Sequence, residues 1–249
     1  MDYARFVDQI TEQAAAMRSA VATAGPAVVV PTCPEWTVRD LVRHLARVHQ
    51  WAGRSLLTDP EGQSPQRDEP PADWDGLLFW WDEQVGTLVD TLRKLGPDVP
   101  TWVFDPKSPH TAGFWARRQA HETAIHRLDA EHAVAGSDAP DAVPTLMFDP
   151  SFAADGVEEG LVVPVSRRSL REGVTVTGTV LFHAADAGRA WLVRLVPGAP
   201  LEIGAAEPGI DADASVVGTA DAVYRAVWSR PSHAVRGGDH ALIAALRAP

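Results

Sequence analysis

The 249-residue sequence contains a single cysteine, Cys33. One cysteine cannot form an internal disulfide, and it excludes zinc modules that are built from several thiolates. Any bound metal must therefore be held mainly by nitrogen and oxygen atoms. The sequence also lacks a run of about 18 apolar residues, so we expect no membrane-spanning helix.

Positive charge is scarce as well. The chain has 22 Lys and Arg against 33 Asp and Glu, which gives a net charge of −11, and its lysines are Lys94 and Lys107. Because phosphate binding needs clustered basic residues, this balance argues against a nucleic-acid partner. Residues 1–6 lack the basic-then-apolar layout of a signal peptide, so we expect a cytoplasmic protein. Nothing in the sequence indicates an oligomeric state.

The first half of the chain has the apolar periodicity of helices. Helical spacing and stop signals predict four helices, over about 3–23, 37–57, 72–95 and 111–135. Thr37 and Asp40 have the spacing of a capping box at the start of the second helix. The predicted inward stripe of that helix consists of Leu41, His44, Leu45, Val48 and Trp51 or Ala52. Residues 28–36 are expected to be extended, and four helices with two long loops fit a four-helix bundle.

The second half of the chain differs from the first in composition and in the periodicity of its apolar residues. Residues 138–144 have the composition of a linker, and the following residues alternate β-formers with glycines. Strands are predicted over 173–182, 190–196 and 214–218, and helices over about 219–228 and 239–247. The sequence thus predicts an α+β protein with a helical bundle over 1–137 and a small α+β domain over 145–249.

One polar stripe on the fourth predicted helix contains residue types that can bind a metal. Glu122, His126 and Asp129 fall at i, i+4 and i+7, within an arc of roughly 60° on an α-helix. A carboxylate and an imidazole one turn apart can hold a divalent metal if a third ligand comes from another element, and His44 is the best candidate. The alternative is an ordinary charged helix face with an i,i+4 pair.

The same segment also invites a metalloprotease interpretation, because His121-Glu122 is followed by a second histidine. The two histidines are five residues apart, which places His121 and His126 about 140° apart around a helix. They cannot both bind one metal from a straight helix. The metalloprotease motif is therefore absent.

Three stretches of the chain resemble the mycothiol-dependent maleylpyruvate isomerase family, which belongs to a wider group of DinB-like metal-binding bundles. They are Pro34-Glu-Trp-Thr-Val-Arg-Asp-Leu-Val-Arg-His-Leu45, His121-Glu-Thr-Ala-Ile-His-Arg-Leu-Asp129 and Val216-Val-Gly-Thr-Ala-Asp-Ala-Val-Tyr-Arg-Ala-Val-Trp-Ser-Arg230. The third stretch is similar to the family's sterol-carrier-like C-terminal domain. The resemblance therefore covers nearly the whole chain.

The resemblance implies a divalent metal, usually zinc, held by His44, Glu122 and His126. It also implies that Asp129 lies beside the metal and that Arg230 binds substrate or thiol. The implied cofactor is mycothiol. A metal with an open position can bind a thiol and favour its reactive thiolate. The expected activity is a mycothiol-dependent cis–trans isomerase or a thiol S-transferase acting on a small electrophile. The alternatives are a non-catalytic protein that binds metal and an apolar ligand, and a metal-dependent hydrolase.

Two roles stay open at this stage. Asp129 accepts the thiol proton or orients a metal-bound water, or else it pairs with Arg127 or Arg225. Arg118, one turn before Glu122, binds a carboxylate of the substrate or forms a salt bridge with Glu122.

Overall fold

The computed structural model of the chain describes residues 1–248. These residues form two compact units, the first over Met1–Asp138 and the second beginning at Ala139. The first unit is helical apart from a small hairpin, and the second combines a five-stranded sheet with helices. The predicted α+β fold class is confirmed. No helix within residues 1–248 is long and apolar enough to cross a membrane.

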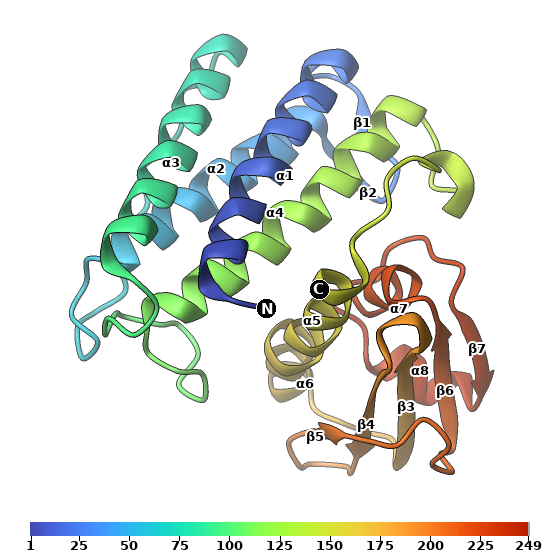
Figure 1. Cartoon of the computed structure of the whole chain (residues 1–249). Helices are drawn as coiled ribbons and strands as arrows, with labels where there is room; N and C mark the ends of the chain where they lie inside the picture. The colour runs from blue at the N-terminus through green and yellow to red at the C-terminus, as the bar shows by residue number, and fades with distance from the viewer. Residues whose placement is uncertain (249) are drawn as a thin grey trace. The chain divides into compact units, whose positions relative to one another are not determined.

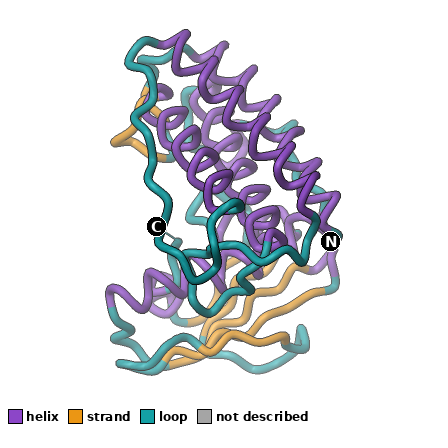
Figure 2. The backbone as a smooth tube through the Cα atoms, turned by 90° about the vertical axis from the view of Figure 1, so that its left-hand side faces the viewer, coloured by secondary structure: helices purple, strands orange, loops and turns teal. Residues whose placement is uncertain are grey.

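The first unit is a bundle of four long helices, visible in both views (Figure 1, Figure 2). Its elements are α1 (Tyr3–Ala24), β1 (Val29–Val30), β2 (Cys33–Thr37), α2 (Val38–Ser55), α3 (Trp74–Leu95) and α4 (Ala112–Ala135). All four helices lie within about two residues of the predicted ends. The predicted capping box is also confirmed, because the Thr37 side chain accepts from the Asp40 backbone while the Asp40 side chain accepts from the Thr37 backbone.

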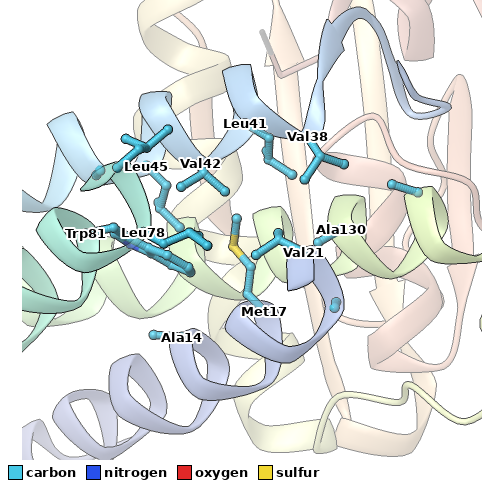
Figure 3. Close-up of a cluster of buried hydrophobic side chains, with 14 of the residues drawn as sticks. Ala14, Met17, Val21, Val38, Leu41, Val42, Leu45, Leu78, Trp81 and Ala130 are labelled. Carbon is cyan, nitrogen blue, oxygen red and sulfur yellow. The ribbon is translucent and has the colours of Figure 1, made fainter. Parts of the chain in front are cut away.

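Apolar side chains from all four helices fill the interior of the bundle, as the close-up in Figure 3 shows for part of the core. Met17 of α1, Leu41 and Leu45 of α2 and Trp81 of α3 are almost completely buried there. The periodicity that predicted the helices therefore also orients them. Burial of each of these large side chains contributes about 1.5–3 kcal/mol to folding.

The inward stripe predicted for α2 needs a correction. Val48 is only partly buried, and of the two alternatives Trp51 and Ala52 it is Ala52 that is buried. Val42, Ala46 and His49 are buried as well. The side chain of His44, also expected inside, is 35% exposed. The buried face of α2 is thus turned toward Val42 and His49, which leaves His44 at its edge.

The extended segment between α1 and α2 forms a hairpin. β1 and β2 pair antiparallel, with Val30 opposite Cys33, so that Pro31 and Thr32 make the turn. Val30 is completely buried in the bundle core. The backbone N–H of Val38 donates to the carbonyl of Val28. These contacts tie the hairpin to the start of α2.

The second unit is built on a five-stranded sheet of order β5-β4-β3-β6-β7, in which only the β3–β6 pair is parallel. Its elements are α5 (Pro150–Gly160), a π-helical turn η2 (Leu161–Val165), α6 (Ser166–Glu172), β3 (Gly178–Ala184), β4 (Arg189–Leu195), β5 (Glu202–Ala205), β6 (Ala214–Gly218), α7 (Ala220–Val227), β7 (Val235–Gly238) and α8 (His240–Ala245), with 3-10 turns η1 (Pro140–Ala142) and η3 (Ala185–Ala187). α7 packs against the sheet, and α5 packs against α7.

One prediction for this unit was wrong, and one helical segment was missed. The strand predicted over 173–182 begins only at Gly178, because its partner β4 ends at Leu195 opposite Gly178, and Val174 pairs instead with Gly198 through a single backbone hydrogen bond. The helices over 150–172 were not predicted. Pro164 interrupts their helical pattern, and the chain passes this proline through the π-helical turn rather than ending the helix.

Candidate metal centre

Two helices of the first unit bring three potential metal ligands together. His44 comes from α2, and Glu122 and His126 come from successive turns of α4. Glu122 Oε1 lies 3.2 Å from His44 Nε2 and 3.4 Å from His126 Nε2. All three ligand atoms lie within 4.8 Å of one another. The structure therefore places His44, Glu122 and His126 in one group.

We call His44, Glu122 and His126 the trio, and two further residues of α4 contact Glu122 and His126 and fix their side chains. Arg118, one turn before Glu122, forms a salt bridge with Glu122 Oε2. Asp129 Oδ2 lies 2.9 Å from His126 Nδ1, so the ring nitrogen that faces away from the trio is engaged. These two contacts direct Oε1 of Glu122 and Nε2 of His126 toward His44. Of the two open roles for Arg118, the structure shows the salt bridge.

Asp129 is completely buried, and its second oxygen is held by the hairpin. The Thr32 hydroxyl donates to Asp129 Oδ1 at 2.6 Å, and the Cys33 thiol lies 3.8 Å from Oδ2. Arg127, one expected partner of Asp129, donates instead to Gln13. The other expected partner, Arg225, belongs to the second unit and pairs there with Asp221. Asp129 thus contacts His126 and the hairpin.

Neighbouring groups determine the protonation states of Glu122 and His126 when no cation is present. Burial alone would raise the pKa of Glu122, but Arg118 and the hydrogen bonds from His126 and His44 hold it well below its ordinary value. Burial would likewise lower the pKa of His126, but hydrogen bonds to Asp129 and Glu122 raise it to about 9. Glu122 is therefore ionised at neutral pH and His126 carries the compensating proton.

A pocket of about 520 Å³ opens over His44. Trp36 of β2 forms one wall, with its ring centroid 4.9 Å from that of His44 and 6.1 Å from that of His126. The charged residues that line it are Glu35, Asp40, Arg43, Arg47 and Arg67. The trio therefore has a buried side, formed by α4, and an accessible side, formed by α2 and the hairpin.

The remaining candidates from the sequence lie elsewhere. His121 is completely buried and packs edge-on against Phe6 of α1, with ring centroids 6.0 Å apart, which agrees with its exclusion as a ligand. Arg230 belongs to the second unit, where it follows α7 and donates to the Trp228 carbonyl. Its role toward substrate or thiol stays a prediction.

Two groups of residues at this site were not predicted. Thr32 contacts Asp129 across 97 positions of sequence, which no local pattern signals. The pocket arginines are the second group. Arg43 and Arg47 lie one turn apart on α2, so their shared face was visible in the sequence. Arg67 comes from the loop between α2 and α3, and only the fold brings it to the same pocket.

Comparison with known proteins identifies the family. The family model described as mycothiol maleylpyruvate isomerase N-terminal domain matches residues 7–131, about half of the chain. No curated protein matches. A crystal structure of a histidine-to-alanine variant of the mycothiol-dependent maleylpyruvate isomerase is similar over 95% of this chain and 93% of that one, with a TM-score of 0.62 and 11% identity. A second structure of that enzyme has the same coverage, a TM-score of 0.56 and 13% identity. The predicted resemblance is thus confirmed, and the chain belongs to the mycothiol maleylpyruvate isomerase N-terminal domain family.

Proposed function

We propose that this protein is a mycothiol-dependent metalloenzyme that acts on a small electrophile, either as a cis–trans isomerase or as a thiol S-transferase. The observation that carries the proposal is the convergence of His44, Glu122 and His126 within 4.8 Å of one another, with His44 lining a pocket. Membership in a family named for a mycothiol-dependent isomerase supports the choice of thiol and reaction.

The three residues fit a divalent metal, and zinc in particular. Two imidazole nitrogens and one carboxylate oxygen form a common catalytic zinc set that leaves a coordination position open. The hydrogen bond between His126 Nδ1 and Asp129 is the outer contact that metal-binding histidines usually have. Arg118 holds the far oxygen of Glu122 and so orients its carboxylate toward the histidines.

A metal in this position would bind the thiol and favour its thiolate, the form that adds to an electrophilic carbon. The contacts of Asp129 support a positioning role rather than proton transfer. Its side chain is completely buried, and its oxygens face Thr32, Cys33 and His126. We therefore assign Asp129 to the orientation of His126.

The charge around the pocket supports an electrophile that carries a negative group. Three arginines, Arg43, Arg47 and Arg67, line the pocket against two acidic side chains, in a protein whose net charge is −11. Glu69 pairs with Arg43 at 2.7 Å and more distantly with Arg47 at 3.5 Å. Arginine suits such a role because its planar guanidinium can bind a carboxylate through two hydrogen bonds.

Calorimetric titration of the zinc-loaded protein with mycothiol tests the proposal. We expect binding that disappears in His44→Ala after the same zinc treatment, because this variant should hold no zinc, and that persists in His49→Leu, a variant of the neighbouring buried histidine. Product analysis with a cis-unsaturated carboxylate then separates the two reactions, because an isomerase returns the thiol unchanged and a transferase consumes it. A zinc-loaded protein that binds no mycothiol would contradict the proposal and favour a hydrolase or a binding protein.

A further inference from the structure

The hairpin β1–β2 contacts both helices that carry the candidate ligands. Its turn residue Thr32 reaches Asp129 of α4, and Trp36 near its end packs on His44 of α2. We propose that Thr32 is a positioning residue for metal binding and acts on His126 through Asp129. The inference rests on the proposed metal site and adds to it a residue from outside the two ligand-bearing helices.

The geometry forms a continuous chain of hydrogen bonds. The Thr32 hydroxyl lies 2.6 Å from Asp129 Oδ1, and His126 Nδ1 lies 2.9 Å from Asp129 Oδ2. Oδ1 of the carboxylate thus contacts the Thr32 hydroxyl, whereas Oδ2 contacts His126 and, at 3.8 Å, the Cys33 thiol. With Nδ1 engaged in this way, His126 presents Nε2 to Glu122 and His44.

The Thr32 hydroxyl matters because it fixes the plane of the Asp129 carboxylate. The terminal torsion of an aspartate side chain is broad, so the plane is better defined when both oxygens accept hydrogen bonds than when the contacts of His126 and Cys33 hold Oδ2 alone. A second donor, on the opposite oxygen, restricts the rotation. Since Asp129 is completely buried, water does not readily replace this donor.

The position of Thr32 is itself well supported. Pro31 precedes it in the two-residue turn, and the neighbouring Val30 is anchored in the bundle core. At the other end of the hairpin, Thr37 caps α2, the helix that carries His44. One nine-residue segment, 29–37, therefore holds Asp129 on one side and the start of α2 on the other, which sets the spacing of the two histidines.

Zinc affinity, measured by competition with a chelator, tests the inference without any assay of activity. Thr32→Val removes the hydroxyl at nearly constant volume and should weaken zinc binding by about 10–100-fold, the usual effect of losing an outer hydrogen bond. Thr32→Ser restores the donor and should bind zinc like the wild type. Thr11→Val is the matched control, because Thr11 donates only to the Val7 carbonyl within α1.

A double-mutant cycle shows whether Thr32 acts through Asp129. In an Asp129→Ala background, Thr32→Val should cause no further loss of zinc affinity. Should Thr32→Val fail to fold, Thr32→Ala makes the same comparison at this partly exposed turn position. Wild-type affinity in the variant that lacks the hydroxyl, or an equal loss with and without Asp129, would overturn this inference alone. A wild-type protein that binds no zinc would overturn the proposed function together with it.

Discussion

Helices α2 and α4 hold two polar clusters, each with a histidine from α2, that differ in what they can do. The first is the trio of His44, Glu122 and His126. The second lies deeper, where His49 of α2 meets Thr123 of α4 and Trp81 of α3. Glu122 and Thr123 are adjacent in sequence, so the two clusters are close neighbours along α4.

The polar groups of the deeper cluster are hydrogen-bonded to one another and to the backbone. Trp81 donates to His49 Nδ1 at 3.2 Å, which leaves His49 Nε2 to donate to the Thr123 hydroxyl at 2.9 Å, and that hydroxyl donates to the Gln119 carbonyl. No carboxylate takes part in these contacts. Burial therefore lowers the pKa of His49 to about 3, and the ring is neutral at physiological pH.

The trio has the opposite character. It contains an ionised carboxylate, its ring nitrogens Nε2 converge on one oxygen, and it opens to a pocket. Its His126 is protonated when no cation is present, because Asp129 and Glu122 raise its pKa to about 9 against the effect of burial. The difference teaches that side chains converging on a carboxylate beside a pocket are the arrangement expected of a metal site, whereas a histidine paired with neutral groups belongs to a packed core.

The largest effect is expected from Glu122→Gln, which keeps the shape of the side chain and removes its charge. Zinc affinity should fall by more than the roughly 10–100-fold caused by losing an outer hydrogen bond, because a direct ligand is lost. Chelator competition measures the change. An affinity within threefold of wild type would mean that Glu122 is not a ligand.

The second effect is a pH dependence of zinc binding. Zinc must displace the proton from His126 Nε2, and this proton is held up to a pH of about 9. The apparent affinity should therefore rise by about tenfold per pH unit between pH 7 and 9 and level off above that. Zinc titrations at several pH values, corrected for hydroxide and buffer binding, measure the slope. A flat profile would contradict the assigned protonation of His126.

The third prediction tests whether the two clusters are independent, by comparing the free energy of unfolding with the zinc affinity. His49→Leu leaves the Trp81 N–H without its acceptor and should lower the free energy of unfolding by about 1–3 kcal/mol. The zinc affinity of the folded variant should stay close to wild type. Urea unfolding of the chelator-treated protein and a zinc titration provide the two numbers. Loss of zinc binding comparable to that in Glu122→Gln would merge the clusters into one functional unit.

The smallest effect concerns acid stability. Because the folded pKa of His49 lies below its unfolded value of about 6.5, protonation of the unfolded chain lowers stability as pH falls below 6.5. The slope approaches about 1.4 kcal/mol per pH unit for this one group. Urea unfolding of metal-free wild type and His49→Leu between pH 6.5 and 5 should show a shallower slope in the variant. Equal slopes would mean that His49 does not remain neutral in the folded protein.

Much of the bundle could be predicted from sequence, because its helices carry local signals. Both the capping box at Thr37 and the apolar spacing of α2 and α3 can be recognised from residues a few helical turns apart in the sequence. Residues 150–172 of the second unit could not be predicted in the same way. Pro164 breaks the helical pattern there, and the chain passes it through a π-helical turn that no local pattern signals.

In the candidate site, too, the residues on one helix could be predicted from sequence, whereas contacts between distant segments could not. The spacing of Glu122 and His126 on one helix was sufficient to propose two ligands, and the resemblance to a family supported His44 as the third. The contact from Thr32 to Asp129 and the approach of Arg67 to the pocket depend on how the hairpin and loop fold back on the bundle. Such long-range contacts have no periodic signature in a single sequence.

The central claim is that the trio, and not the deeper cluster, binds a metal. Metal content, measured after loading with zinc and removal of loosely bound ions, tests this claim most directly. The account predicts one zinc per chain in the wild type and in His49→Leu, and none in His44→Ala. A wild type without zinc, or a His44→Ala variant with a full equivalent, would contradict it.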